Sequence, residues 1–63
     1  MKPDAGQIAA LQAYAGRNGR CWKSKLNHAW MTGRDEWEPE SARLRSIRNQ
    51  FGPTWLFNFR LPK

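Results

Sequence analysis

Apolar residues recur at helical spacing in three separate stretches of this chain. In the first stretch, Ile8, Leu11 and Ala15 stand at positions i, i+3 and i+7. Side chains spaced by three and four residues share one side of an α-helix. Asp4 precedes the stretch as a candidate N-cap, so the pattern predicts a helix over about residues 5–17.

The second stretch has Trp22, Leu26 and Trp30 at i, i+4 and i+8. This stripe predicts a helix over about residues 20–32, and Gly33 is a suitable C-cap after it. Because the turn before this stretch is short, we expect the first two helices to pack as close neighbours.

The third stretch contains Leu44, Ile47 and Phe51 at i, i+3 and i+7. These residues predict a helix over about residues 40–50. The Gly-Pro pair that follows Phe51 ends it, because proline cannot continue a helix and glycine closes one readily.

The pattern changes near the C-terminus, where large apolar residues alternate at a period of two. The alternating residues are Trp55, Phe57, Phe59 and Leu61. This period, with many aromatic residues, is typical of a strand, so we expect an extended or β segment over residues 55–61. A short helical continuation is the alternative. Since no second strand is evident, the segment would cover the helices or pair with a second copy of the chain.

These elements predict a mainly α protein that forms one small domain over residues 1–63. It would have three short helices and the C-terminal extended or β segment. A chain of this length buries only about 60% of its extended-state surface. A homodimer through residues 55–61 would enlarge the small core.

Charge is unevenly distributed along the chain, whose formal net charge is +6. Four of the five acidic residues fall within six positions, as Asp35, Glu36, Glu38 and Glu40, and basic residues occupy both flanks. A strongly basic surface attracts anionic partners. We therefore expect a nucleic acid, with DNA favoured over RNA, or an acidic protein surface.

Basic and amide side chains fall on the outer faces of the second and third predicted helices. Arginine and lysine contact phosphates and guanine, and asparagine reads adenine. The candidate nucleic-acid-binding residues are Arg17, Arg20, Lys23, Asn27, Arg45, Arg48 and Asn49. Ala15 and Gly19 also match part of the turn of a helix-turn-helix motif. Lys25 and His28, however, stand where that motif is apolar.

Two plainer interpretations stay open for these faces. The first two helices could form a hairpin whose basic face is simply solvated. In the third helix, Arg43 and Arg45 could pair with the acidic connection, each exposed pair contributing about 1 kcal/mol or less.

The aromatic residues support a second hypothesis, a protein-binding accessory factor or inhibitor. Its candidate partner-binding residues are Trp37, Trp55, Phe57 and Phe59. Trp37 stands among acids, where it is either a lid on the core or an exposed anchor. The C-terminal segment could add to a partner as a strand or lie in a groove.

The chain offers little support for catalysis, and we expect neither a cofactor nor a metal. His28 is the only histidine and has no carboxylate within one helical turn to orient it. Cys21 and His28 do not make a tetrahedral ligand set. A single cysteine excludes an internal disulfide, and no secretory leader is recognisable, so we expect a cytoplasmic protein. No apolar run approaches the ~20 residues that span a bilayer, so no membrane partner is expected.

Several short motifs carry a resemblance. The sequence reads Leu-Arg-Ser-Ile-Arg-Asn over residues 44–49, Gly-Pro-Thr-Trp-Leu over 52–56 and Phe-Arg-Leu over 59–61, with Gly-Arg-Cys-Trp-Lys over 19–23. In these stretches the chain resembles short uncharacterised bacterial proteins of the mobile-element or accessory type. The resemblance implies a bacterial cytosolic setting, and it implies no particular activity or site residue.

Overall fold

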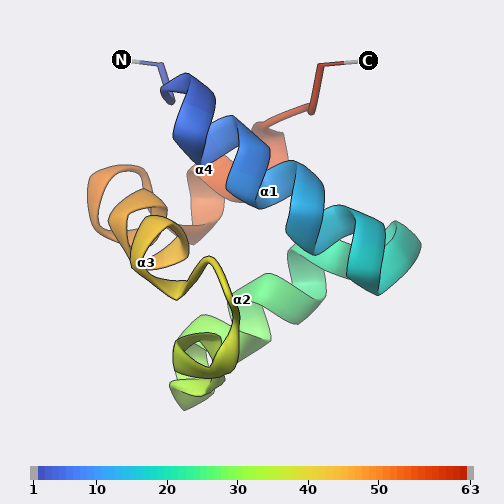
Figure 1. Cartoon of the computed structure of the whole chain (residues 1–63), viewed down its shortest axis with the longest axis vertical. Helices are drawn as coiled ribbons and strands as arrows, with labels where there is room; N and C mark the ends of the chain where they lie inside the picture. The colour runs from blue at the N-terminus through green and yellow to red at the C-terminus, as the bar shows by residue number, and fades with distance from the viewer. Residues whose placement is uncertain (1, 63) are drawn as a thin grey trace.

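The computed structural model describes residues 2–62, which form four α-helices and two short 3-10 helices (Figure 1). In chain order they are α1 (Ala5–Asn18), η1 (Gly19–Cys21), α2 (Trp22–Thr32), η2 (Arg34–Trp37), α3 (Ser41–Gln50) and α4 (Gly52–Asn58). The mainly α fold and the three predicted helices are confirmed. No helix among the described residues is long and apolar enough to cross a membrane.

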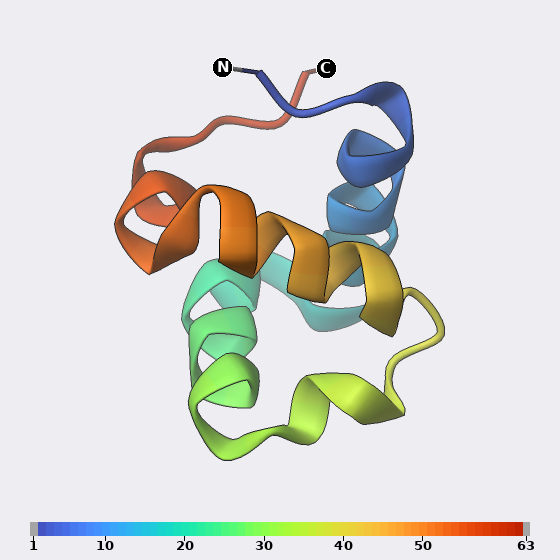
Figure 2. The ribbon, with the colours of Figure 1, turned by 90° about the vertical axis from the view of Figure 1, so that its left-hand side faces the viewer.

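The helix α3 lies across the middle of the molecule and crosses α1 and α2 at steep angles (Figure 2). The chain bends at Gly52, where α4 begins. The helix α4 packs against both α3 and α2. The fully buried apolar side chains come from all four helices: Leu11, Leu26, Leu44, Ile47 and Leu56. Burying each such side chain contributes about 1.5–3 kcal/mol, so a core this small depends on every helix.

A reciprocal hydrogen-bond pair begins α1. The Asp4 carboxylate accepts from the Gln7 backbone N–H at 2.7 Å, and the Gln7 side chain accepts from the Asp4 N–H at 3.0 Å. The predicted N-cap is therefore confirmed. The same Gln7 side chain is buried and donates to Ser46 at 3.1 Å and to Gln50 at 2.7 Å. Gln7 thus joins the start of α1 to α3, a role that no periodicity in the sequence indicates.

The prediction of an extended or β segment over residues 55–61 is wrong, because residues 52–58 form the helix α4. Pro53 lies in the first turn of α4, where its missing N–H costs nothing. A lone strand would have left its backbone donors and acceptors unpaired, whereas a helix pairs them internally. Only the short stretch after Asn58 leaves the helix, with extended backbone at Phe59.

Side-chain packing favours the helix at this point as well. Phe51, Trp55 and Phe59 stand four residues apart and stack in sequence, with ring centroids 4.3 and 4.7 Å apart. Leu56, which a strand would have turned away from its aromatic neighbours, is fully buried in the core. The tail therefore carries two overlapping patterns, and the spacing of four residues prevails because it places Leu56 inside.

The connection between α2 and α3 is ordered as the 3-10 helix η2. Gly33 closes α2 in the left-handed conformation, at φ 76°. That conformation favours glycine and turns the chain from α2 directly into η2. The predicted C-cap is confirmed, and the acidic residues after it are held at defined places.

We expect Gln7→Ala to lower the free energy of unfolding by about 1–3 kcal/mol, because it removes half of the capping pair and the donor to Ser46 and Gln50. Urea denaturation followed by far-ultraviolet circular dichroism measures this loss. Gln12→Ala is the matched control, since Gln12 is an exposed residue of the same helix. Equal stability of the two variants would contradict the role of Gln7.

Candidate nucleic-acid interface

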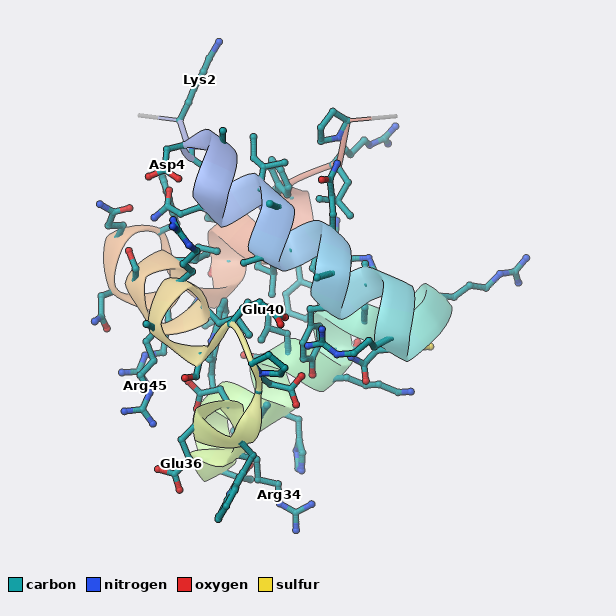
Figure 3. All side chains as sticks on the ribbon, viewed as in Figure 1. Lys2, Asp4, Arg34, Glu36, Glu40 and Arg45 are labelled. Atoms are coloured by element: carbon teal, nitrogen blue, oxygen red, sulfur yellow. The ribbon has the colours of Figure 1, made fainter. Side chains whose placement is uncertain are left out.

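The acidic connection binds an arginine from α1. Nη2 of Arg17 donates to Glu38 at 2.6 Å and to Glu40 at 2.7 Å, and Nη1 donates to the second oxygen of Glu40 at 3.1 Å. Glu40 lies beside α1 (Figure 3). The hydrogen bonds to Glu40 and Glu38 raise the pKa of Arg17 further above its usual value. Two carboxylates therefore already neutralise Arg17, which was predicted to contact phosphates.

A second ion pair joins η2 to α3. Asp35 is fully buried, and its Oδ2 accepts from Nε of Arg45 at 3.1 Å. Nη2 of Arg45 also lies 4.0 Å from a carboxylate oxygen of Glu36. Both residues are labelled on the same side of the molecule in Figure 3. The plainer interpretation of Arg45, pairing with the acidic connection, is thus confirmed. Arg43 behaves differently, since its guanidinium lies over the backbone of Gly6 in α1.

Positive charge without such partners gathers where α2 begins. Arg20 is exposed in η1, and Lys23 follows three residues later. The Lys23 ammonium donates to the backbone carbonyl of Phe59, so it brings the next residue, the exposed Arg60, close to α2. None of these three basic residues forms an ion pair among residues 2–62. We name Arg20, Lys23 and Arg60 the α2–tail surface.

The remaining predicted nucleic-acid-binding residues lie on α2 and α3. Arg48 donates to the side-chain oxygen of its exposed neighbour Asn49 through two long contacts of 3.4 Å. Such contacts are weak, so the Arg48 guanidinium stays available to another acceptor. Asn27 is half-buried and lies 3.9 Å from the sulfur of Met31. Asn49 is therefore more accessible to a base edge than Asn27.

The four predicted partner-binding aromatics have different surroundings. Trp37 is 80% exposed, so it is an anchor on the surface and not a lid on the core. Trp55 and Phe59 are half-buried within the stacked rings of α4 and its end. Phe57, on another side of α4, is 48% exposed. Of the four, Trp37 and Phe57 thus present a large apolar surface to a partner.

An open pocket of about 390 Å³, which the sequence did not predict, lies between α1, α2 and η2. Its lining residues are Tyr14, Ser24, Lys25, His28, Ala29, Arg34 and Glu38. Burial raises the pKa of the Tyr14 hydroxyl, the charge of Glu38 adds to the rise, and Arg17 opposes it. The Tyr14 hydroxyl is therefore a proton-bearing donor at neutral pH. The sequence did indicate two of these lining residues. Lys25 and His28 stand where a helix-turn-helix motif would have apolar residues, and both lie on the side of α2 that lines the pocket.

Within residues 2–62, no three histidine, cysteine or acidic side chains come together as a metal site would require. Cys21 is exposed and unpaired. Comparison with known protein families, with curated proteins and with solved structures finds no match for this chain. The resemblance to mobile-element proteins stays a prediction, and function has to be inferred from the side chains themselves.

We expect Arg45→Gln to lower the free energy of unfolding by about 1–3 kcal/mol, because it leaves the buried Asp35 carboxylate without its cation. Arg48→Gln removes the same charge from the same helix and breaks only weak contacts, so we expect a change within about 0.5 kcal/mol. Urea denaturation of both variants measures the difference. A loss of stability no greater for Arg45→Gln than for Arg48→Gln would rule out a structural role for the Asp35–Arg45 pair.

Proposed function

We propose that this protein binds nucleic acid through the α2–tail surface, with Arg48 and Asn49 of α3 as a second contact. The observation that carries the proposal is the Lys23 contact with the Phe59 carbonyl. It holds the residue before Arg60 against Lys23, three residues after Arg20, and none of these three basic residues forms an ion pair within residues 2–62. Arginine and lysine in such a region neutralise phosphates and release condensed counterions, which drives association.

Arg17 and Arg45 take a different part in this proposal from the one the sequence suggested. Glu38 and Glu40 occupy Nη1 and Nη2 of Arg17, and the buried Asp35 occupies Nε of Arg45. Both arginines therefore support the fold, and the phosphates are contacted by the basic residues that carry no ion pair. Binding through so few phosphate contacts should be largely independent of base sequence, because phosphates carry no sequence information directly.

Fluorescence anisotropy with labelled duplex and single-stranded DNA tests the proposal. We expect binding at micromolar protein in low salt, and an affinity that falls linearly on a logarithmic salt scale, with a slope of about −2 to −4 for three or four phosphate contacts. The double variant Arg20→Gln/Arg60→Gln should reduce the steepness of that slope by about 2 and weaken binding at least tenfold.

Arg43→Gln is the control for charge alone, because Arg43 is exposed but lies over α1 and outside the α2–tail surface. Its DNA affinity should stay within about twofold of the original protein. Absence of binding to both DNAs at micromolar protein in low salt would contradict the proposal. Equal losses of DNA affinity in Arg43→Gln and in the double variant would exclude the α2–tail surface as the DNA-binding site.

A protein partner is the second candidate, and the exposure of Phe57 supports it. Since α4 is a helix, its partner would receive it as a helix in a groove and not as an added strand. A homodimer through residues 55–61 stays a prediction and would likewise have to use the helical surface of α4. Deletion of α4 cannot test either idea, because it would remove Leu56 from the core.

Phe57→Ser tests this candidate with little effect on the core. We expect it to abolish capture of a protein partner, or to convert a dimer into a monomer in sedimentation velocity, because it removes the exposed apolar residue of α4. Thr54→Ser, at another exposed position of the same helix, should change neither result. Unaltered capture and unaltered sedimentation in Phe57→Ser would exclude Phe57 as the contact.

A further inference from the structure

The ion pair of Arg45 leaves most of its guanidinium open. Nε of Arg45 donates to Oδ2 of Asp35 at 3.1 Å, whereas Nη2 lies 4.0 Å from Glu36, beyond hydrogen-bond distance. Among residues 2–62, neither Nη1 nor Nη2 of Arg45 donates a hydrogen bond. These groups carry most of the N–H donors of an arginine. Arg45 therefore differs from Arg17, whose Nη1 and Nη2 are both bound by carboxylates.

The buried carboxylate fixes the guanidinium of Arg45 in place. Asp35 is fully buried in η2, and in the part of the chain that the structure describes Arg45 is the one cation within ion-pair distance of it. The Arg45 side chain is nevertheless 45% exposed, and Figure 3 shows it at the outer edge of the molecule beside α3. A guanidinium held at Nε and open at Nη1 and Nη2 is pre-organised, because it loses little rotamer freedom when it binds a ligand.

The helix α3 carries Arg45 on a face that no other described element covers. Ala42, Arg45 and Asn49 stand at i, i+3 and i+7, and all three are exposed. The buried residues Leu44 and Ile47 lie on the other side of the helix. Figure 1 shows α3 at one edge of the molecule, and Figure 2, turned toward that edge, shows it in front of α1 and α2. A helix that stands clear of its neighbours can enter the major groove of a duplex, which is about 12 Å wide.

We propose that Arg45 reads guanine in the major groove of duplex DNA, with Asp35 as its positioning residue. Nη1 and Nη2 donate to O6 and N7 of guanine, a pair of acceptors that no other base presents in that groove. The small side chain of Ala42 lets the helix backbone approach the base edges. Base reading by Arg45 rests on the proposed nucleic-acid binding, in which α3 already supplies a second contact. It adds a base preference that phosphate contacts alone do not carry.

Fluorescence anisotropy of the full chain with two labelled duplexes of equal length, at one low salt concentration, tests this base reading. One duplex alternates dG and dC, and the other alternates dA and dT. We expect the dG·dC duplex to bind at least about fivefold more tightly, the lower end of the discrimination by one bidentate contact. Replacing every guanine by 7-deazaguanine removes N7 and leaves the phosphates unchanged, so it should abolish the preference.

Arg45→Lys separates base reading from charge. Lysine keeps a cation opposite Asp35 but lacks the planar fork, so we expect loss of the guanine preference and an affinity for the dA·dT duplex within about twofold of the original protein. Arg43→Lys is the matched control, because it makes the same exchange in α3 at a side chain that lies over α1. It should retain the preference.

Asp35→Asn tests the positioning role. It keeps the guanidinium and removes the charge that holds it, so the guanine preference should fall while the affinity for the dA·dT duplex stays unchanged. An undiminished preference in a folded Asp35→Asn protein would contradict this role. Arg45→Lys decides the base reading should the buried substitution prevent folding.

The outcomes separate base reading from the proposed function. Tighter binding of the dA·dT duplex, or a guanine preference that survives 7-deazaguanine or Arg45→Lys, would overturn base reading by Arg45. Equal and salt-dependent binding of both duplexes would also reject it, but would leave phosphate binding by the α2–tail surface standing. Absence of binding to either duplex would contradict the proposed function, and base reading with it.

Discussion

The ion pair between Asp35 and Arg45 is the constraint on which the arrangement of this protein depends. A fully buried carboxylate is tolerated only when a cation and hydrogen bonds compensate its lost hydration. Arg45 supplies the cation and one hydrogen bond from α3 to Oδ2 of Asp35, while Oδ1 is buried without a hydrogen-bond partner within residues 2–62, so the pair with Arg45 is what holds η2 against the body of the molecule. With η2 in place, Arg34 and the Glu38 that follows η2 line a pocket beside α1 and α2.

The same acidic connection divides the basic residues into two groups with different tasks. Arg17 and Arg45 are bound by carboxylates and tie α1 and α3 to the connection. Within residues 2–62, Arg20, Lys23 and Arg60 have no such partners, although the chain carries a formal charge of +6. The net positive charge therefore predicts that the protein attracts an anion. The ion pairs determine which basic side chains are free to bind that anion.

The C-terminal residues show how a small core can override a clear local pattern. Alternation of large apolar residues favoured a strand, but residues 2–62 contain no second strand to pair with it. As a helix, α4 pairs its own backbone groups, stacks three aromatic rings and places Leu56 in the core. In a chain of 63 residues, one more buried leucine outweighs a modest preference for extended backbone.

The sequence by itself determined three helices, their caps at Asp4 and Gly33, and the presence of an acidic segment between basic flanks, because periodicity and capping are local properties. It could not determine which charges pair. Arg17 meets Glu38 across 21 residues, and Lys23 meets Phe59 across 36, and such contacts exist only once the helices have packed. The pocket likewise forms only when residues of α1, α2 and η2 come together. Burial of Leu56 made the tail a helix instead of a strand. Local spacing thus defined the helices, and packing between distant segments decided which basic and aromatic side chains are left to bind a partner.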